Sequence, residues 1–204
     1  MKSAKRLLVL GVLSTSILAF AQEAAPTKDK EAINVNEVER GLYFGATAGA
    51  FFLLSAPAGG PFSQGQSAGI EVGYDIGDRL SVGGFVMATA NRAGAEYVGR
   101  SGGLASGDFS AMIPGAVVRG NLVGFDDSQK VRRTWVYVRG GAGYVMFSPK
   151  QLLPDPDILV FAGPGVEYYT RLRHFSVGLE VTGSFLITSG SIGFAITPNL
   201  RYAF

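Results

Sequence analysis

The residues of this sequence that could do chemistry are mostly charged side chains set into alternating segments. In these segments large apolar residues occupy every second position, with small or polar residues between them. This is the side-chain period of a β-strand. The polar faces carry four carboxylates and three guanidinium groups: Glu71, Asp75, Glu167, Glu180, Arg119, Arg139 and Arg201. Each lies close to a short turn or a chain end, so we expect them to share one half of the molecule.

Residue sets for catalysis or metal binding are missing from the sequence. Its single histidine, His174, falls in a predicted turn, where a lone histidine is usually a solvated surface residue. There is no cysteine, which excludes disulfides and thiolate metal sites. No Ser-His-carboxylate set can be built, and glycine pairs such as Gly163-Pro164-Gly165 lie within strands rather than before a helix. We therefore expect no catalytic residue, no metal ion and no cofactor.

The amino terminus has the features of a secretory signal peptide. Lys2, Lys5 and Arg6 precede an uncharged apolar run that ends in Ala19-Phe20-Ala21, an A-x-A cleavage pattern. The run is too short to span a membrane as a helix. We expect cleavage after Ala21, which divides the chain into a signal peptide (1–21), a polar periplasmic segment (22–40) and a folded domain (41–204).

The charge balance argues against a nucleic-acid partner. Without the three basic residues of the signal peptide, 15 of the 18 lysines and arginines remain, against 16 acidic residues. The mature chain is thus nearly neutral and lacks the basic excess that nucleic-acid binding requires.

The alternating pattern recurs eight times after residue 40, with short turns and longer loops following one another in alternation. Strands of this length cross a bilayer when tilted, and this order of turns and loops is typical of transmembrane barrels. The sequence therefore predicts an all-β fold, an eight-stranded antiparallel up-and-down transmembrane β-barrel, with both chain ends on the periplasmic side. The expected strands are Gly41–Leu54, Ala68–Ile76, Leu80–Ala90, Phe109–Phe125, Thr134–Phe147, Ile158–Thr170, Phe175–Phe185 and Ile192–Phe204. The face of the fourth strand is open, because a register slip at Pro114 would exchange its two sides; if Val118 and Leu122 face lipid, Arg119 and Asn121 face in.

The last strand ends in an aromatic residue. Leu200, Tyr202 and Phe204 lie on one face, as in the closing strands of outer-membrane barrels, whose assembly machinery recognises such a tail. Aromatic residues near other strand ends suit interfacial girdles. The expected girdle residues are Tyr43, Phe52, Tyr74, Phe109, Phe125, Trp135, Tyr168, Phe175, Tyr202 and Phe204.

A barrel of eight strands is only wide enough to hold its own side chains. The seven inward charges are then removed from bulk water and must pair, and arginine is well suited to bidentate contacts with carboxylates. They form either a hydrogen-bonded plug or a path for protons or ions. We favour the plug, since the inward glycines leave room for long side chains.

Three stretches resemble a known family: Glu31 to Gly41, Gln151 to Ile158 and Tyr168 to His174. They are similar to the CglE-type adventurous gliding-motility proteins of Gram-negative bacteria, and the architecture resembles small barrels of the OmpA and OmpX type. The resemblance implies an outer-membrane component of an envelope-spanning gliding machinery. Periodicity and spacing indicate only a barrel.

Two classes of function follow. The first is a non-enzymatic anchor in outer-membrane lipids, inserted by the barrel assembly machinery, that engages envelope or motility proteins through Gln22–Arg40 or its surface loops. Within this class, a generic structural or adhesive barrel is the alternative. The second class is a small barrel enzyme or a narrow pore. The missing catalytic histidine near the outer rim favours the first class.

Overall fold

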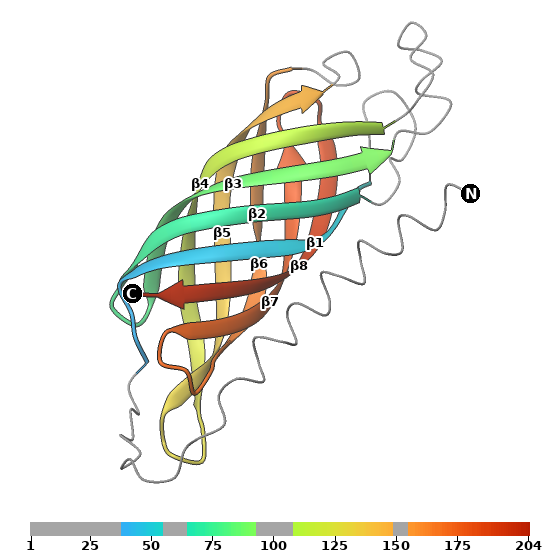
Figure 1. The fold of residues 1–204 in the computed structure, drawn as a ribbon. Helices are drawn as coiled ribbons and strands as arrows, with labels where there is room; N and C mark the ends of the chain where they lie inside the picture. The colour runs from blue at the N-terminus through green and yellow to red at the C-terminus, as the bar shows by residue number, and fades with distance from the viewer. Residues whose placement is uncertain (1–37, 55–64, 93–107, 149–154) are drawn as a thin grey trace, which may run out of the picture. The chain divides into compact units, whose positions relative to one another are not determined.

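A computed structural model describes residues 38–54, 65–92, 108–148 and 155–204. Eight strands close into one barrel in which each strand pairs with its neighbours in sequence and β1 pairs with β8 (Figure 1). All eight pairings are antiparallel. The predicted eight-stranded up-and-down barrel is therefore confirmed. The strands are β1 (Leu42–Leu53), β2 (Gly65–Ile76), β3 (Leu80–Arg92), β4 (Asp108–Asp126), β5 (Arg132–Ser148), β6 (Asp157–Tyr169), β7 (Phe175–Leu186) and β8 (Ser191–Ala203).

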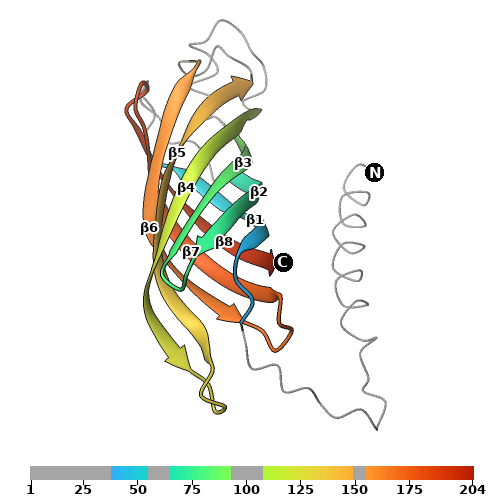
Figure 2. The ribbon, with the colours of Figure 1, turned by 90° about the vertical axis from the view of Figure 1, so that its left-hand side faces the viewer.

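The two ends of the barrel differ. One end, here called the turn end, carries the short connections β2–β3, β4–β5 and β6–β7, and it is also where β1 begins and β8 ends. The hairpin of β4 and β5, the two longest strands, extends furthest at this end (Figures 1 and 2). The other end, the loop end, carries the connections β1–β2, β3–β4, β5–β6 and β7–β8.

The outer face of the barrel is apolar all the way round. Large hydrophobic side chains on every strand are exposed, among them Ile70, Val118, Val138 and Leu179. An exposed apolar surface of this extent is not stable in water and marks a membrane-facing band. In the part of the chain that the structure describes, no helix has the length and apolarity needed to cross a membrane.

The register of β4 settles which of its faces points inward. Pro114 pairs with Val86 without a slip, and the irregularities lie further along, between Asn121 and Val123 and between Phe125 and Asp126. Val118 and Leu122 face outward while Arg119 and Asn121 are buried, as the conditional prediction requires.

Three prolines within strands interrupt the ladder on one side only. Pro114 keeps its pair in β3, Pro164 its pair in β5 and Pro198 its pair in β7, whereas the ladders to β5, β7 and β1 skip these positions. Proline has no N–H to donate, which explains the one-sided gaps. Two such gaps need glycine beside them, because a Cβ on Gly163 would lie 2.0 Å from the Val181 carbonyl oxygen and one on Gly49 2.1 Å from that of Ile196.

The barrel interior has two halves of different chemistry. The half toward the loop end is an apolar core of buried side chains, namely Phe51, Leu53, Ala111, Ile113, Val145, Phe147, Leu159, Leu186 and Ala195, with Phe85, Met87 and Phe161 packed against it. The half toward the turn end holds the seven charged side chains singled out in the sequence, and one further buried carboxylate, Asp157, lies at the loop end. From the sequence we expected the seven charges to share one half of the molecule but made no prediction for the apolar half.

Two of the expected girdle residues point the other way. Tyr43 is 2% exposed and Trp135 is 3% exposed, so both rings lie inside the barrel. The assignment of these two to an interfacial girdle was wrong, because their positions alternate with the outward residues Phe44 and Val136. Tyr74, Phe125, Tyr168 and Phe204 are exposed on the outside, and the side chain of Phe109 lies outside the described residues.

Candidate functional site: a closed polar lumen

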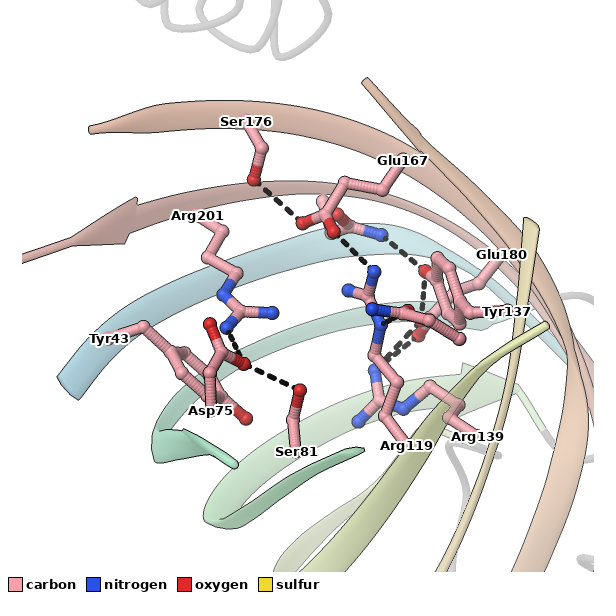
Figure 3. A network of polar contacts seen from close by, with 12 residues as sticks. Tyr43, Asp75, Ser81, Arg119, Tyr137, Arg139, Glu167, Ser176, Glu180 and Arg201 are labelled. Atoms are coloured by element: carbon pink, nitrogen blue, oxygen red, sulfur yellow. Dashed lines mark hydrogen bonds and ion pairs between the residues drawn. The ribbon is translucent and has the colours of Figure 1, made fainter. Parts of the chain in front are cut away.

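The structure brings all seven predicted charges into the turn-end half of the lumen, where they form three groups (Figure 3). In the first group the Arg119 guanidinium from β4 contacts the Glu167 carboxylate from β6. The second Glu167 oxygen accepts a hydrogen bond from Ser176 Oγ at 2.7 Å, and Arg119 Nε donates to Asn121 Oδ1 at 3.1 Å. Glu167 is completely buried, so its charge depends on these partners.

The second group is centred on Arg139, which bridges two carboxylates. Its Nη1 lies 2.7 and 2.8 Å from the two oxygens of Glu180, and its Nη2 lies 2.9 Å from Glu71 Oε2. Tyr43 donates to the other Glu71 oxygen at 2.6 Å, and Tyr137 donates to Glu180 at 3.1 Å. The side chains come from four strands, β1, β2, β5 and β7, so this group ties opposite walls of the barrel together.

The third group lies level with the first, since Ser81 is the register partner of Arg119 and Arg201 that of Ser176. Arg201 of β8 contacts the Asp75 carboxylate of β2, and Ser81 Oγ donates to the same carboxylate at 2.6 Å. The Arg201 guanidinium also covers the Tyr43 ring, 3.5 Å from its centroid, while Arg119 lies 3.7 Å from the Tyr137 centroid. Each of these two guanidinium groups therefore gains a cation–π contact in addition to its ion pair.

The turn-end mouth is closed by Arg40, a residue that the sequence placed in the polar periplasmic segment. Its guanidinium lies over the rings of Trp135 and Tyr169, 5.4 and 5.3 Å from their centroids, and its Nε lies 3.3 Å from Asp78 Oδ1. The preceding Glu39 pairs with Arg173 at 2.8 Å. No periodicity signals these contacts, because Arg40 precedes the first strand.

Little open space remains between the side chains of the polar half. One internal cavity of about 30 Å³ is lined by all three lumen arginines, and a second of about 40 Å³ lies beside Phe85 and Phe161. Cavities of this size hold one or two waters. Since the apolar core follows directly toward the loop end, the lumen is a filled interior rather than a channel.

His174 does not behave as the solvated turn residue that was expected. It is half-buried, its Nδ1 lies 2.7 Å from the Ala203 carbonyl oxygen, and its ring stacks on Tyr202 with centroids 5.3 Å apart. His174 is half-buried because the closing strand runs beside the β6–β7 turn. Among the described residues, His174 forms no hydrogen bond with a carboxylate or hydroxyl, and no three His, Cys, Asp or Glu side chains gather to hold a metal ion.

The three tail residues lie on the outer face at the end of β8. Leu200 and Phe204 are exposed, and the Tyr202 ring lies edge-on to Phe175 and to Phe204, with centroids 4.9 and 5.0 Å apart. Recognition of this tail by assembly machinery stays a prediction. The cleavage site after Ala21 and the segment 22–37 lie outside the described residues.

At the loop end, one buried carboxylate was missed by the sequence analysis. Asp157, the first residue of β6, accepts hydrogen bonds from the backbone amides of Ile158, Thr188 and Ser189 at 2.7, 2.7 and 3.0 Å. It therefore fixes the β7–β8 connection to β6. An aspartate that follows a loop rich in proline gives no signal for a contact about thirty residues away.

The comparisons with known proteins show the fold. No family model matches the chain, and no curated protein matches it. The structure is similar to that of the Neisserial surface protein A, with a TM-score of 0.59, 17% identity and coverage of 82% of this chain and 100% of that one. It is also similar to the outer membrane protein OprG from Pseudomonas aeruginosa, with a TM-score of 0.53, 10% identity and coverage of 83% and 99%.

Proposed function

We propose that this protein is a non-conducting, non-enzymatic barrel of the bacterial outer membrane that anchors part of an envelope-spanning gliding machinery. The observation that carries the proposal is the filled lumen. Three arginine–carboxylate groups occupy one half and an apolar core the other, which leaves no open path for ions along the lumen. The function then depends on the proteins that the barrel binds and holds at the membrane.

The proposed orientation places the turn end in the periplasm and the loop end outside the cell. Transmembrane barrels have short periplasmic turns and longer outer loops. The β1–β2, β3–β4 and β5–β6 connections of this chain follow that rule, whereas β7–β8, residues 187–190, is as short as the turns. Both ends of the barrel domain are then periplasmic, so the segment Gln22–Arg40 faces the envelope interior. Partners would bind this segment or the outer loops.

The gliding role is supported by the sequence resemblance described above rather than by the fold, which many outer-membrane proteins share. Within the described residues, the stretch Tyr168 to His174 forms the end of β6 and the β6–β7 turn. It lies at the turn end, where an envelope partner would approach. A generic structural or adhesive barrel is the alternative within the same class.

Deletion of the gene tests the anchor role. We expect single-cell gliding to decrease while permeability of the outer membrane to small hydrophilic antibiotics stays unchanged. Re-expression of the His174→Ala variant should restore gliding as fully as the wild type, because His174 contacts only a backbone carbonyl and a tyrosine ring. Normal gliding in the deletion strain would reject the anchor role, and failure of the His174 variant alone would reopen a chemical role.

Conductance separates the anchor from a pore. Purified protein in planar bilayers should give no steady current, since the apolar core blocks the lumen. Reproducible unitary conductance from the wild-type protein would contradict the filled-lumen argument.

A further inference from the structure

Each of the three short turns exposes one cation that has no partner among the described residues. Arg79 lies in the β2–β3 turn, Lys130 in the β4–β5 turn and Arg171 in the β6–β7 turn, and all three are exposed. Among the described residues, none of these three side chains forms an ion pair or a hydrogen bond. The remaining cations of the turn end are paired, as the next paragraph describes.

Four acidic side chains at the turn end already form ion pairs with other cations. Asp78 pairs with Arg40, Asp126 with Arg132, Asp127 with Arg133, and Glu39 with Arg173, at distances between 2.8 and 3.3 Å. Each of these four carboxylates thus neutralises one cation. Among the described side chains outside the lumen at this end, the three unpaired cations are the surplus.

The β4–β5 turn is built so that Lys130 points outward. The Asp127 carboxylate accepts the backbone amides of Val131 at 3.0 Å and Gln129 at 2.8 Å, and it also contacts Arg133 Nε. The Val131 amide, with the help of the Gln129 amide and Arg133, holds the pKa of the Asp127 carboxyl below its usual value. That carboxylate is thereby engaged by its own turn and leaves Lys130 without an acidic neighbour.

Two of the three cations, Arg79 and Arg171, adjoin the apolar outer face of the barrel. Leu172, which is 65% exposed, follows Arg171, and the exposed Leu80 follows Arg79. Long basic side chains at such a boundary lay their aliphatic stems on apolar surface and keep the charge at headgroup level. Tyr74 and Phe204, exposed at the same end, are placed as aromatic residues are at a membrane interface.

We propose that Arg79, Lys130 and Arg171 form a basic rim that binds the headgroups of anionic phospholipids. Cations on three turns around the barrel can contact the phosphate groups of several lipids. Their attraction is stronger for lipids with a net negative charge, such as phosphatidylglycerol. Zwitterionic phosphatidylcholine offers no net charge and so provides the reference lipid. The proposed membrane orientation decides only which leaflet the rim contacts, namely the periplasmic one. The lipid binding itself does not depend on it.

The test compares lipids retained by the folded mature protein in nanodiscs. Wild-type protein is placed in nanodiscs of equal parts phosphatidylglycerol and phosphatidylcholine, and the retained lipids are counted by native mass spectrometry. In the triple variant Arg79→Gln, Lys130→Gln, Arg171→Gln we expect the preference for phosphatidylglycerol to fall about fivefold per cation, on the order of a hundredfold in total. The matched control, Arg92→Gln, Arg100→Gln, Lys150→Gln, removes the same charge from segments toward the loop end and should keep the preference.

Each other outcome overturns the proposal in a distinct way. An equal loss of the phosphatidylglycerol preference in both variants would show a general effect of net charge. An unchanged preference in the rim variant would show that these cations do not bind lipid. Displacement of phosphatidylglycerol by millimolar glycerol phosphate would indicate a site for soluble anions. Tighter, rim-dependent binding of an acidic peptide would indicate a protein partner. Failure here leaves the anchor proposal untouched, because the gliding and conductance tests do not depend on lipid preference.

Discussion

Replacement of Arg139 by alanine is the sharpest test of the lumen, because this side chain holds two buried carboxylates at once. It makes two contacts with Glu180 and one with Glu71, and all three side chains are at most 16% exposed. Three charge-assisted hydrogen bonds at about 1.5–3 kcal/mol each set an upper limit on the loss. The carboxylates keep the hydroxyl donors Tyr43 and Tyr137, so we expect a loss of about 3–5 kcal/mol, as for other broken buried pairs.

The assay is urea unfolding of the protein in lipid vesicles. Trp135 is the only tryptophan and lies inside the barrel, so its emission reports loss of the lumen structure. Arg132→Ala is the matched control: its ion pair with Asp126 has the same chemistry at 3.0 Å, but both side chains are about half exposed, and its loss should cost less than about 1 kcal/mol.

A second variant distinguishes the free-energy cost of an unpaired buried charge from the cost of lost packing. Arg139→Met combined with Glu71→Gln and Glu180→Gln removes the carboxylate charges together with the cation, so it should regain much of the loss. If Arg139→Ala costs no more than Arg132→Ala, the lumen charges are solvated and the plug interpretation is wrong.

Two further predictions concern the ends of the barrel domain. Deletion of Phe204 should lower the amount of folded, heat-modifiable protein in outer membranes, measured by gel mobility with and without boiling; undiminished insertion would mean that the aromatic tail is only the end of a strand. Arg40→Ala should lower the unfolding free energy by about 1–2 kcal/mol through loss of its contacts with two rings, whereas Asp78→Asn, which removes only a largely exposed partner, should cost less than about 1 kcal/mol. Equal effects of the two changes would show that the ring contacts do not matter.

The strand pattern and the inward positions of the lumen charges could be read from the sequence because both follow from a period of two. In β7, Ser176, Glu180 and Thr182 alternate with Val177 and Leu179, and the structure keeps that order. Which arginine meets which carboxylate could not be read, since it depends on the stagger between strands that are distant in sequence. Arg139 and Glu71 are 68 residues apart.

The apolar half of the lumen escaped prediction for a different reason. Phe51, Ile113 and Leu159 are inward apolar residues on strands whose outward residues are also apolar. With both faces apolar, alternation carries no information about direction. Tyr43 and Trp135 were misplaced for the same reason, because an aromatic residue near a strand end suits an interface and an interior equally well.

The ion pairs of Glu39 and Arg40 determine how the barrel would carry a mechanical load. Tension on the chain before Val38 reaches the barrel at the turn end, first through the Glu39–Arg173 and Arg40–Asp78 pairs and then through β1. Because β1 is held between β2 and β8 along most of its length, a pull along the barrel axis loads those ladders in shear. In shear the ladder hydrogen bonds share the force instead of opening one after another, so the attachment resists pulling best along the membrane normal.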